Sequence, residues 1–232
     1  MGLFKGWLEK LFAGNGGNSA DAPISHTAKP QDEEKHFKVV RVQPTPNPDA
    51  FQFIMSGPVI AAGTTKTFES AEDAKDDLLA EALFAIFGVE NVFLKENFVT
   101  VTKSKVVGWH TLMEPIGETI EEHLRFIATA KTQNAPKPEI DPVLAEFNKE
   151  DFVNCTDEQK TKVIEALLDV AVRPALSNDG GGLDIIGIEG NVVKIHYQGA
   201  CGSCPSSTTG TLNYIENFLK EAIHPDLVVQ AN

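Results

Sequence analysis

The stretch YQGACGSCPSSTTGTLNYIENFL, from Tyr197 to Leu219, joins a strand pattern to a helix pattern through a loop of small residues. It places Cys201 and Cys204 with two residues between them, and Pro205 stands where the first helical position is expected. Backbone N–H groups at the start of a helix carry partial positive charge, which favours the thiolate form of nearby cysteines. The spacing therefore predicts a pair of thiolates at the mouth of a helix.

The residues around this loop predict a small domain over residues 156–232. Thr156 and Gln159 have the spacing of a capping box, so a helix is expected to begin there, and Pro174 should kink or end it. A β-hairpin with its turn at Gly190–Asn191 then leads into the cysteine loop. One more helix follows the loop. The expected order of elements is α–β–β–loop–α.

An earlier domain is expected over residues 37–130. The segments FKVVRVQ and FQFIM read as strands on either side of the proline-rich loop PTPNPD. Ser70 and Asp73 form a capping signal for a helix that Gly88 closes. The segment VENVFLKENFVTVTK then predicts two strands around a turn, and another helix follows Trp109. The chain is therefore predicted to be an α/β (α+β) protein of two small domains.

Three further segments are predicted outside these domains. Residues 1–14 have the apolar periodicity of a short amphipathic helix, which could lie on a membrane surface, dock on a partner or fold back on its own domain. Residues 15–36 are rich in Gly, Pro and polar side chains, as in a flexible tether. Residues 131–155 include KTQNAPKPEIDP and predict a linker between the domains.

The composition excludes several classes of protein. Of the 232 residues, 42% are hydrophobic and 23% charged, which is typical of a globular chain. A formal net charge of −13 repels phosphate backbones, so nucleic acid is not expected as a partner. Three cysteines are too few for a disulfide scaffold, and the segment MGLFKGWLEKLFAG lacks both a secretory pattern and the Arg-rich, acid-poor composition of a transit peptide. We therefore expect a reducing cytoplasm.

Three uses compete for the two thiols. Dithiol–disulfide exchange uses a CxxC between a strand and a helix, as in thioredoxin, but that fold needs more elements after the motif. A structural zinc site needs four protein ligands; His196 is the nearest extra candidate on the strand, and Cys155 lies far upstream. An iron–sulfur cluster also takes four thiolates, which two chains related by a two-fold axis could supply together. A cluster held in this way would be labile, which suits a carrier.

At these residues the sequence resembles the Nfu/NifU-type iron–sulfur cluster scaffold family. The segment RPALSNDGGGLDI followed by QGACGSCPSS is similar to the core of the family's C-terminal domain. The segments PTPNPDAFQF and GVENVFLKENFVTVTK, with Trp109, are similar to the N-terminal domain that many members carry. The resemblance covers nearly all of the chain beyond residue 36.

The resemblance implies a protein without turnover chemistry that binds a cluster at Cys201 and Cys204. The cluster, usually [4Fe–4S] with [2Fe–2S] as the alternative, would bridge a homodimer. It would be built there or received from cluster-donating assembly proteins, and then delivered to apo iron–sulfur proteins. The family's DGG turn matches Asp179–Gly181, for which a tight helix-to-strand connection is the favoured role. Many members have an acidic residue at the next position, where this chain has Gly182. A dithiol–disulfide oxidoreductase is the alternative function.

We also expect supporting roles for residues around the two cysteines and for the N-terminal domain. Gly202, Ser203 and Pro205 are expected to shape the loop and begin the helix behind it. The N-terminal domain shows no catalytic residues, so we expect it to recognise client proteins or to stabilise the complex of donor and acceptor.

Overall fold

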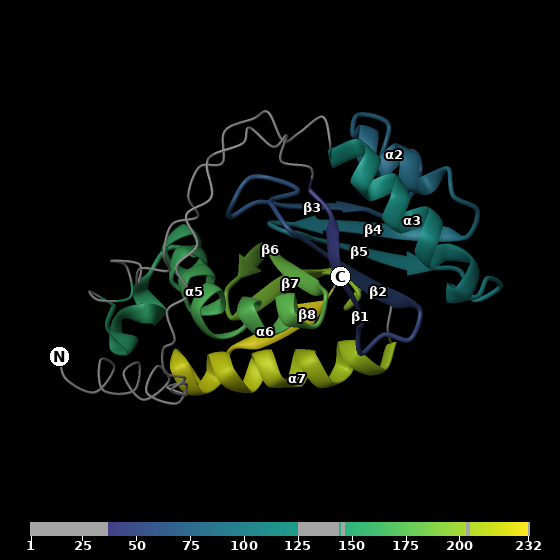
Figure 1. Ribbon diagram of the computed structural model, residues 1–232. Coiled ribbons are helices and arrows are strands. Elements are labelled where there is room, and N and C mark those ends of the chain that lie inside the picture. Colours follow the sequence, from purple (N-terminus) through teal and green to yellow (C-terminus); the bar gives the residue numbers. More distant parts are fainter. Residues whose placement is uncertain (1–36, 125–143, 145–146, 203–204, 232) are drawn as a thin grey trace, which may run out of the picture.

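The computed structural model consists of two domains, each with its own sheet and apolar core (Figure 1). The description covers residues 37–124, 144, 147–202 and 205–231, without the side chains of 205–208. The predicted amphipathic helix and tether lie outside the described residues, as do most of the predicted linker, Ser203 and Cys204.

The N-terminal domain is a five-stranded antiparallel sheet with strand order β1-β2-β5-β4-β3 and two helices. Its elements are β1 (Val39–Pro44), β2 (Ala50–Met55), β3 (Thr65–Phe68), α2 (Leu78–Phe84), β4 (Val89–Lys95), β5 (Phe98–Lys103) and α3 (Trp109–Leu124). The expected β1, β2, hairpin β4–β5 and helix after Trp109 are confirmed.

Both helices cover one face of this sheet, where they bury the alternate apolar residues of the strands (Figure 1). Leu83 of α2 and Ile116 and Ile120 of α3 are fully buried against this face, together with Phe53 and Val92 from the strands. The helix stripes and the strand alternation that the sequence shows therefore meet in one core.

Both ends of α2 and one short strand differ from the sequence-based expectation; the helix ends at Phe84 and not at Gly88. Helix α2 begins after Asp77, whose side chain accepts a hydrogen bond from the Ala80 N–H, and not after Ser70. The Ser70 hydroxyl instead bonds the Asp73 carboxylate at 2.7 Å within a turn that precedes the helix. Strand β3 was not predicted, because four residues are too few to show a reliable alternation.

The C-terminal domain is a three-stranded sheet, with strand order β6-β7-β8, packed on helices. Its elements are η1 (Lys149–Asn154), α5 (Asp157–Ala171), α6 (Arg173–Asn178), β6 (Gly181–Glu189), β7 (Val192–Gly199), α7 (Pro205–Ala222) and β8 (Val228–Ala231). The predicted α–β–β–loop–α order is present, but it lacks β8, which pairs parallel to β7 at the end of the chain.

Local sequence signals account for the helix boundaries in this domain. Thr156 and Gln159 form the predicted capping box at the start of α5. The helix ends at Ala171, and Pro174 stands in the first turn of α6, where its missing N–H is tolerated. The core also takes in Leu144 and Phe152, two residues of the segment that the sequence assigned to the linker.

The C-terminal domain lies against the face of the N-terminal sheet that α2 and α3 leave uncovered (Figure 1). Strands β4 and β5 contact β7 across this boundary, close to the end of β7 that leads into the cysteine loop. None of the helices in the described part of the chain is both long and apolar enough to cross a membrane.

Candidate cysteine site

The cysteine loop connects the end of β7 at Gly199 to the start of α7 at Pro205, as the sequence predicted. Gly199 has a φ of +62°, a conformation that favours glycine, and its carbonyl accepts a hydrogen bond from the Gly202 N–H at 3.2 Å. Cys201 is only 7% exposed: it packs at the edge of the C-terminal core and lines a cavity that Pro46 and Asn47 close from the other domain. Cys204 was predicted as the second ligand and lies outside the described residues.

The DGG segment is tied directly to this loop. Asp179 ends helix α6, and its backbone N–H bonds the carbonyls of the preceding turn, which is the tight helix-to-strand connection that was predicted. Gly180 follows with a φ of +75°, and its carbonyl accepts a hydrogen bond from the Ala200 N–H at 3.2 Å. The two segments therefore hold each other in place beside Cys201.

Gly181 makes the space that Cys201 occupies. A Cβ atom at this position would lie 2.4 Å from the Cys201 Sγ and 3.0 Å from the Gln198 carbonyl oxygen, far inside van der Waals contact. The thiol therefore packs on the bare backbone of the second glycine of the motif. Sequence reasoning missed this role, although the run of three glycines before a strand was a visible signal.

Tyr197, two positions before the end of β7, lies in the same buried cluster as Cys201. Burial first, and the nearby charge of Cys201 second, raise the pKa of the Tyr197 hydroxyl above its ordinary value of 10.0. This hydroxyl is buried and finds no hydrogen-bond partner within the described residues. Tyr197 therefore holds a neutral hydrogen-bond donor close to the cysteine.

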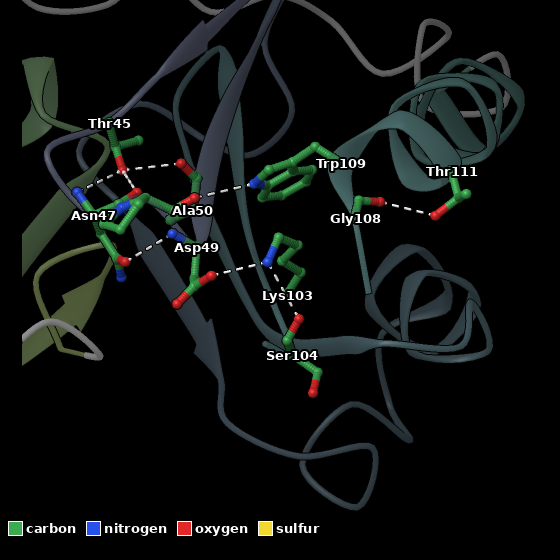
Figure 2. Close-up of polar contacts among 10 residues, drawn as sticks. Thr45, Asn47, Asp49, Ala50, Lys103, Ser104, Gly108, Trp109 and Thr111 are labelled. Atoms are coloured by element: carbon green, nitrogen blue, oxygen red, sulfur yellow. Dashed lines mark hydrogen bonds and ion pairs between the residues drawn. The ribbon is translucent and has the colours of Figure 1, made fainter. Parts of the chain in front are cut away.

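The loop Thr45–Asp49 between β1 and β2 is folded by its own side chains (Figure 2). The Thr45 hydroxyl lies within hydrogen-bond distance of the Asn47 carbonyl oxygen at 2.9 Å and of the Ala50 carbonyl oxygen at 3.0 Å. The Asn47 side-chain oxygen accepts a hydrogen bond from the Asp49 N–H at 3.0 Å. Turns closed by Asn and Thr side chains in this way have few alternative conformations.

Two residues from the rest of the domain brace the same loop (Figure 2). The Trp109 indole N–H donates to the Pro48 carbonyl at 3.2 Å, and the Lys103 ammonium lies 2.8 Å from the Asp49 carboxylate. Lys103 also lies over the Trp109 ring, 5.9 Å from its centroid. The loop is thus a fixed projection of the N-terminal domain.

This projection reaches the cysteine loop of the other domain. The Asn47 side-chain amide, itself only 4% exposed, donates a hydrogen bond to the carbonyl of Ala200 at 3.2 Å. Pro46 and Asn47 form one wall of a cavity of about 250 Å³, and Cys201 and Asp179 line it from the C-terminal domain. The sequence did not predict that the N-terminal domain contributes to the site, because the two segments lie more than 150 residues apart.

The other metal-ligand candidates from the sequence have partners outside the cysteine loop. His196 on β7 lies 3.3 Å from the Glu69 carboxylate, and its side chain is 39% exposed. Cys155 follows the last residue of η1, and its Sγ lies 3.4 Å from the Asp151 carbonyl oxygen. Among the described residues, no three side chains of His, Cys, Asp and Glu are arranged so that they could hold a metal ion.

Known proteins match both domains of the chain. The family profile described as "Scaffold protein Nfu/NifU N terminal" matches residues 40–126, and the profile described as "NifU-like domain" matches residues 164–230. The NFU1 iron-sulfur cluster scaffold homolog, mitochondrial, of Drosophila erecta is 33% identical over 78% of this chain and 60% of its own length. NifU-like protein 5, mitochondrial, of Arabidopsis thaliana is 33% identical over 81% of this chain and 65% of its own length.

The chain thus spans less than two thirds of the length of these relatives. Among solved structures, the NMR structure of a NifU-like protein from Saccharomyces cerevisiae aligns with 46% of this chain and 93% of that one. The identity is 19% and the TM-score is 0.36, which is too low to support a conclusion.

The expected cytoplasmic location is wrong, because the relatives that match most of this chain are named as mitochondrial proteins. The expectation depended on the composition of the segment MGLFKGWLEKLFAG and on the low cysteine count, which indicates only that thiols stay reduced. That chemistry does not distinguish one reducing compartment from another.

Proposed function

The chain belongs to the Nfu/NifU family of iron–sulfur cluster scaffold proteins, and from this premise we propose that it carries a labile cluster and transfers it to apo-proteins. Cys201 and Cys204 bind iron as thiolates, and two copies of the chain hold one cluster between them. The cluster is cargo, so the protein has no turnover chemistry of its own. Its partners are cluster-donating assembly proteins and apo iron–sulfur client proteins.

The number of cysteines supports the two-chain arrangement. Iron–sulfur clusters are held by four thiolates, and this sequence contains three cysteines, of which Cys155 stands in a different segment from the CxxC pair. Two copies of the pair supply the required four around a two-fold axis. We propose [4Fe–4S] as the cargo, because this is the cluster that the family resemblance implies.

The setting of Cys201 is the observation that carries the proposal. Its thiol packs on Gly181 at the edge of the apolar core, and the residue lines a cavity, so the sulfur is held in one place next to open space. Tyr197 belongs to the same buried cluster and keeps a neutral hydroxyl there, and hydrogen bonds to cluster sulfur are one of the means by which proteins tune a cluster. A cluster shared between two chains near solvent is easier to release than one enclosed by a single fold.

Anaerobic reconstitution with ferrous iron and sulfide tests the proposal. The wild-type chain should develop the brown chromophore of a cluster, and Cys201→Ser should lose it. Cys155→Ser is the matched control and should keep the full iron and sulfide content, because the Cys155 thiol contacts the Asp151 carbonyl of its own segment.

A disulfide-reductase assay without iron separates the alternative function. A dithiol oxidoreductase would reduce a model disulfide in the absence of iron and would give no chromophore. That result, or a Cys201→Ser variant with the iron content of the wild type, would contradict the proposed function.

A further inference from the structure

Part of the N-terminal sheet is buried by the C-terminal domain rather than by its own helices. Gln52, Phe93 and Thr100 lie side by side on β2, β4 and β5, because Thr100 pairs with both of the others in the strand register. Together with Thr102 they form what we call the outer face, and each is at most 3% exposed. They alternate along the strands with Phe53, Val92, Val99 and Val101 of the core under α2 and α3, so they lie on the opposite face, where β7 of the other domain contacts β4 and β5.

Three glycines of the C-terminal domain, Gly180, Gly182 and Gly199, lie against residues of the N-terminal domain. A Cβ atom at Gly182 would lie 3.1 Å from the Phe93 ring, and one at Gly199 would lie 2.8 Å from the same ring. A Cβ atom at Gly180 would lie 2.9 Å from a methyl carbon of Thr45 and 3.1 Å from the Thr100 hydroxyl. The missing side chains therefore let the outer face approach the backbone that holds Cys201.

Hydrogen bonds fix this approach at both ends. Asn47 bonds the Ala200 carbonyl, one residue before Cys201. On the other side, the Gln52 amide donates to the Ser177 carbonyl at 3.0 Å, and the Lys95 ammonium donates to the Ser177 hydroxyl at 2.6 Å. The N-terminal domain thus contacts both helix α6, just before the DGG turn, and the cysteine loop that bonds this turn.

The polar groups of this contact indicate that it can open. Side-chain oxygens of Asn91, Thr100, Thr102 and Gln198 are buried there without a hydrogen-bond partner among the described residues. Groups of this kind form hydrogen bonds with water when the contact opens, and Asn91 and Thr102 already line a cavity of about 440 Å³ beside it. Burial also lowers the pKa of Lys95, so its charge too is better solvated when the domains part. The two domains therefore fit closely in shape, and much of the surface between them is polar and suited to water.

We propose that the outer face and the Thr45–Asp49 loop form a docking surface for the cysteine loop of the same chain, which covers Cys201 until a cluster is loaded. Because Pro46 and Asn47 wall the cavity in front of Cys201, they occupy space that a second chain's cysteines need in order to converge on the same cluster. Docking within the chain and sharing of a cluster between chains therefore exclude each other. This exclusion rests on the proposed function, whereas the covering of Cys201 does not.

Alkylation of the cluster-free, full-length chain tests the cover. Gly182→Glu should push against Phe93 and separate the domains, and Thr100→Arg should do the same from the opposite side. In both variants N-ethylmaleimide should modify Cys201 at least about tenfold faster, which corresponds to about 1.4 kcal/mol in the population of the open state. Cys155 in the same molecule is the internal reference, with both peptides followed by mass spectrometry.

Gly187→Glu is the matched control, because Gly187 lies on the same strand β6 and a Cβ atom there meets open space. It should leave the Cys201 rate unchanged. The cover would be refuted if Cys201 reacted at the wild-type rate in both Gly182→Glu and Thr100→Arg. It would also be refuted if Gly187→Glu accelerated the reaction equally, since the effect would then be general loosening of the domain.

The rate of anaerobic cluster loading tests the exclusion separately. Gly182→Glu should load iron and sulfide faster than the wild type by a factor similar to that seen in alkylation. If Gly182→Glu and the wild type loaded at equal rates while the variant was alkylated faster, the cover over Cys201 would stand. The exclusion between docking within the chain and cluster sharing between chains would then be overturned. Failure of every variant to load a cluster would instead contradict the proposed function, and the alkylation result would still decide the cover.

Discussion

At the scale of single residues, the position of Cys201 depends on a neighbour without a side chain. Gly181 provides the surface on which the thiol packs, and Gly180 beside it bonds the loop through its carbonyl. Tyr197 keeps a buried, neutral hydroxyl in the same cluster of side chains. The position of Cys201 therefore depends on the residues that begin β6 and on those that end β7, as well as on the CxxC spacing.

Gly181→Ala should disturb the site even though alanine is the smallest possible change. The added Cβ lies 2.4 Å from the Cys201 Sγ, so either the thiol or strand β6 must shift. Overpacking of this kind destabilises by about 1–3 kcal/mol, which denaturant unfolding of the cluster-free protein would measure. Cluster content after reconstitution should fall as well.

Gly187→Ala on the same strand serves as its control, because its Cβ meets open space and should change stability by no more than about 0.5 kcal/mol. If the two alanine variants unfolded at the same denaturant concentration and bound equal iron, Gly181 would have no special role.

The residues of the site divide into those that the sequence predicted and those that it did not. Cys201, and the DGG turn as a connection, were predicted from spacing and from the resemblance. Asn47 and Tyr197 were not, because their relation to Cys201 appears only when distant segments or a strand face are brought together. A short motif reports the residues that bear the chemistry and says little about those that surround them.

At the scale of elements, α7 and β8 support the cysteine loop from behind. Glu216 on α7 accepts a hydrogen bond from the Val229 N–H on β8 at 3.0 Å and lies 2.6 Å from the Lys220 ammonium. Strand β8 in turn pairs with β7, the strand that ends at the cysteine loop. One carboxylate thus links the last strand to the helix that starts at the loop.

Glu216→Gln should make the stability of the protein less sensitive to acid. The hydrogen bond from Lys220 first, and the one from Val229 second, hold the pKa of the Glu216 carboxyl below its ordinary value of 4.5. A carboxylate with a depressed pKa stabilises the fold above the ordinary value, and this contribution is lost as the pH falls through the lowered one. The wild type should exceed the variant by about 1 kcal/mol or less near neutral pH, and the difference should vanish in strong acid.

Thermal unfolding across a pH series measures this difference, with Glu221→Gln as the control. Glu221 is exposed on the same helix, so its variant should follow the wild-type pH profile. A gap between wild type and Glu216→Gln that stays constant down to strong acid would show that the carboxylate charge is not the cause.

Long periodic segments made most elements predictable, and short ones did not. Helices α3 and α5 and the two hairpins follow apolar periodicity, a capping box and turn residues. Strands β3 and β8 have four residues each. Strand β8 pairs in parallel with β7, and helix α7 lies between the two in the sequence. Such pairing is decided by tertiary packing, which local pattern does not report.

At the scale of the whole molecule, the buried outer face could not have been predicted from the sequence. Gln52, Thr100 and Thr102 alternate with apolar residues, and this pattern ordinarily indicates a sheet face exposed to water. The other domain covers them instead, at the point where β7 leads into the cysteine loop. A polar face that is buried in one arrangement and suited to water in another is consistent with domains that separate during loading.

The central claim is that two chains share one cluster, and a native mass measurement with an iron count tests it most directly. The full chain is reconstituted without air, and the coloured species is weighed while Mössbauer spectroscopy identifies its iron. We predict a species of twice the 25.2 kDa chain mass that carries one [4Fe–4S] cluster and returns to single chains when iron is chelated. A coloured species with the mass of a single chain, and a full cluster bound to it, would contradict the account.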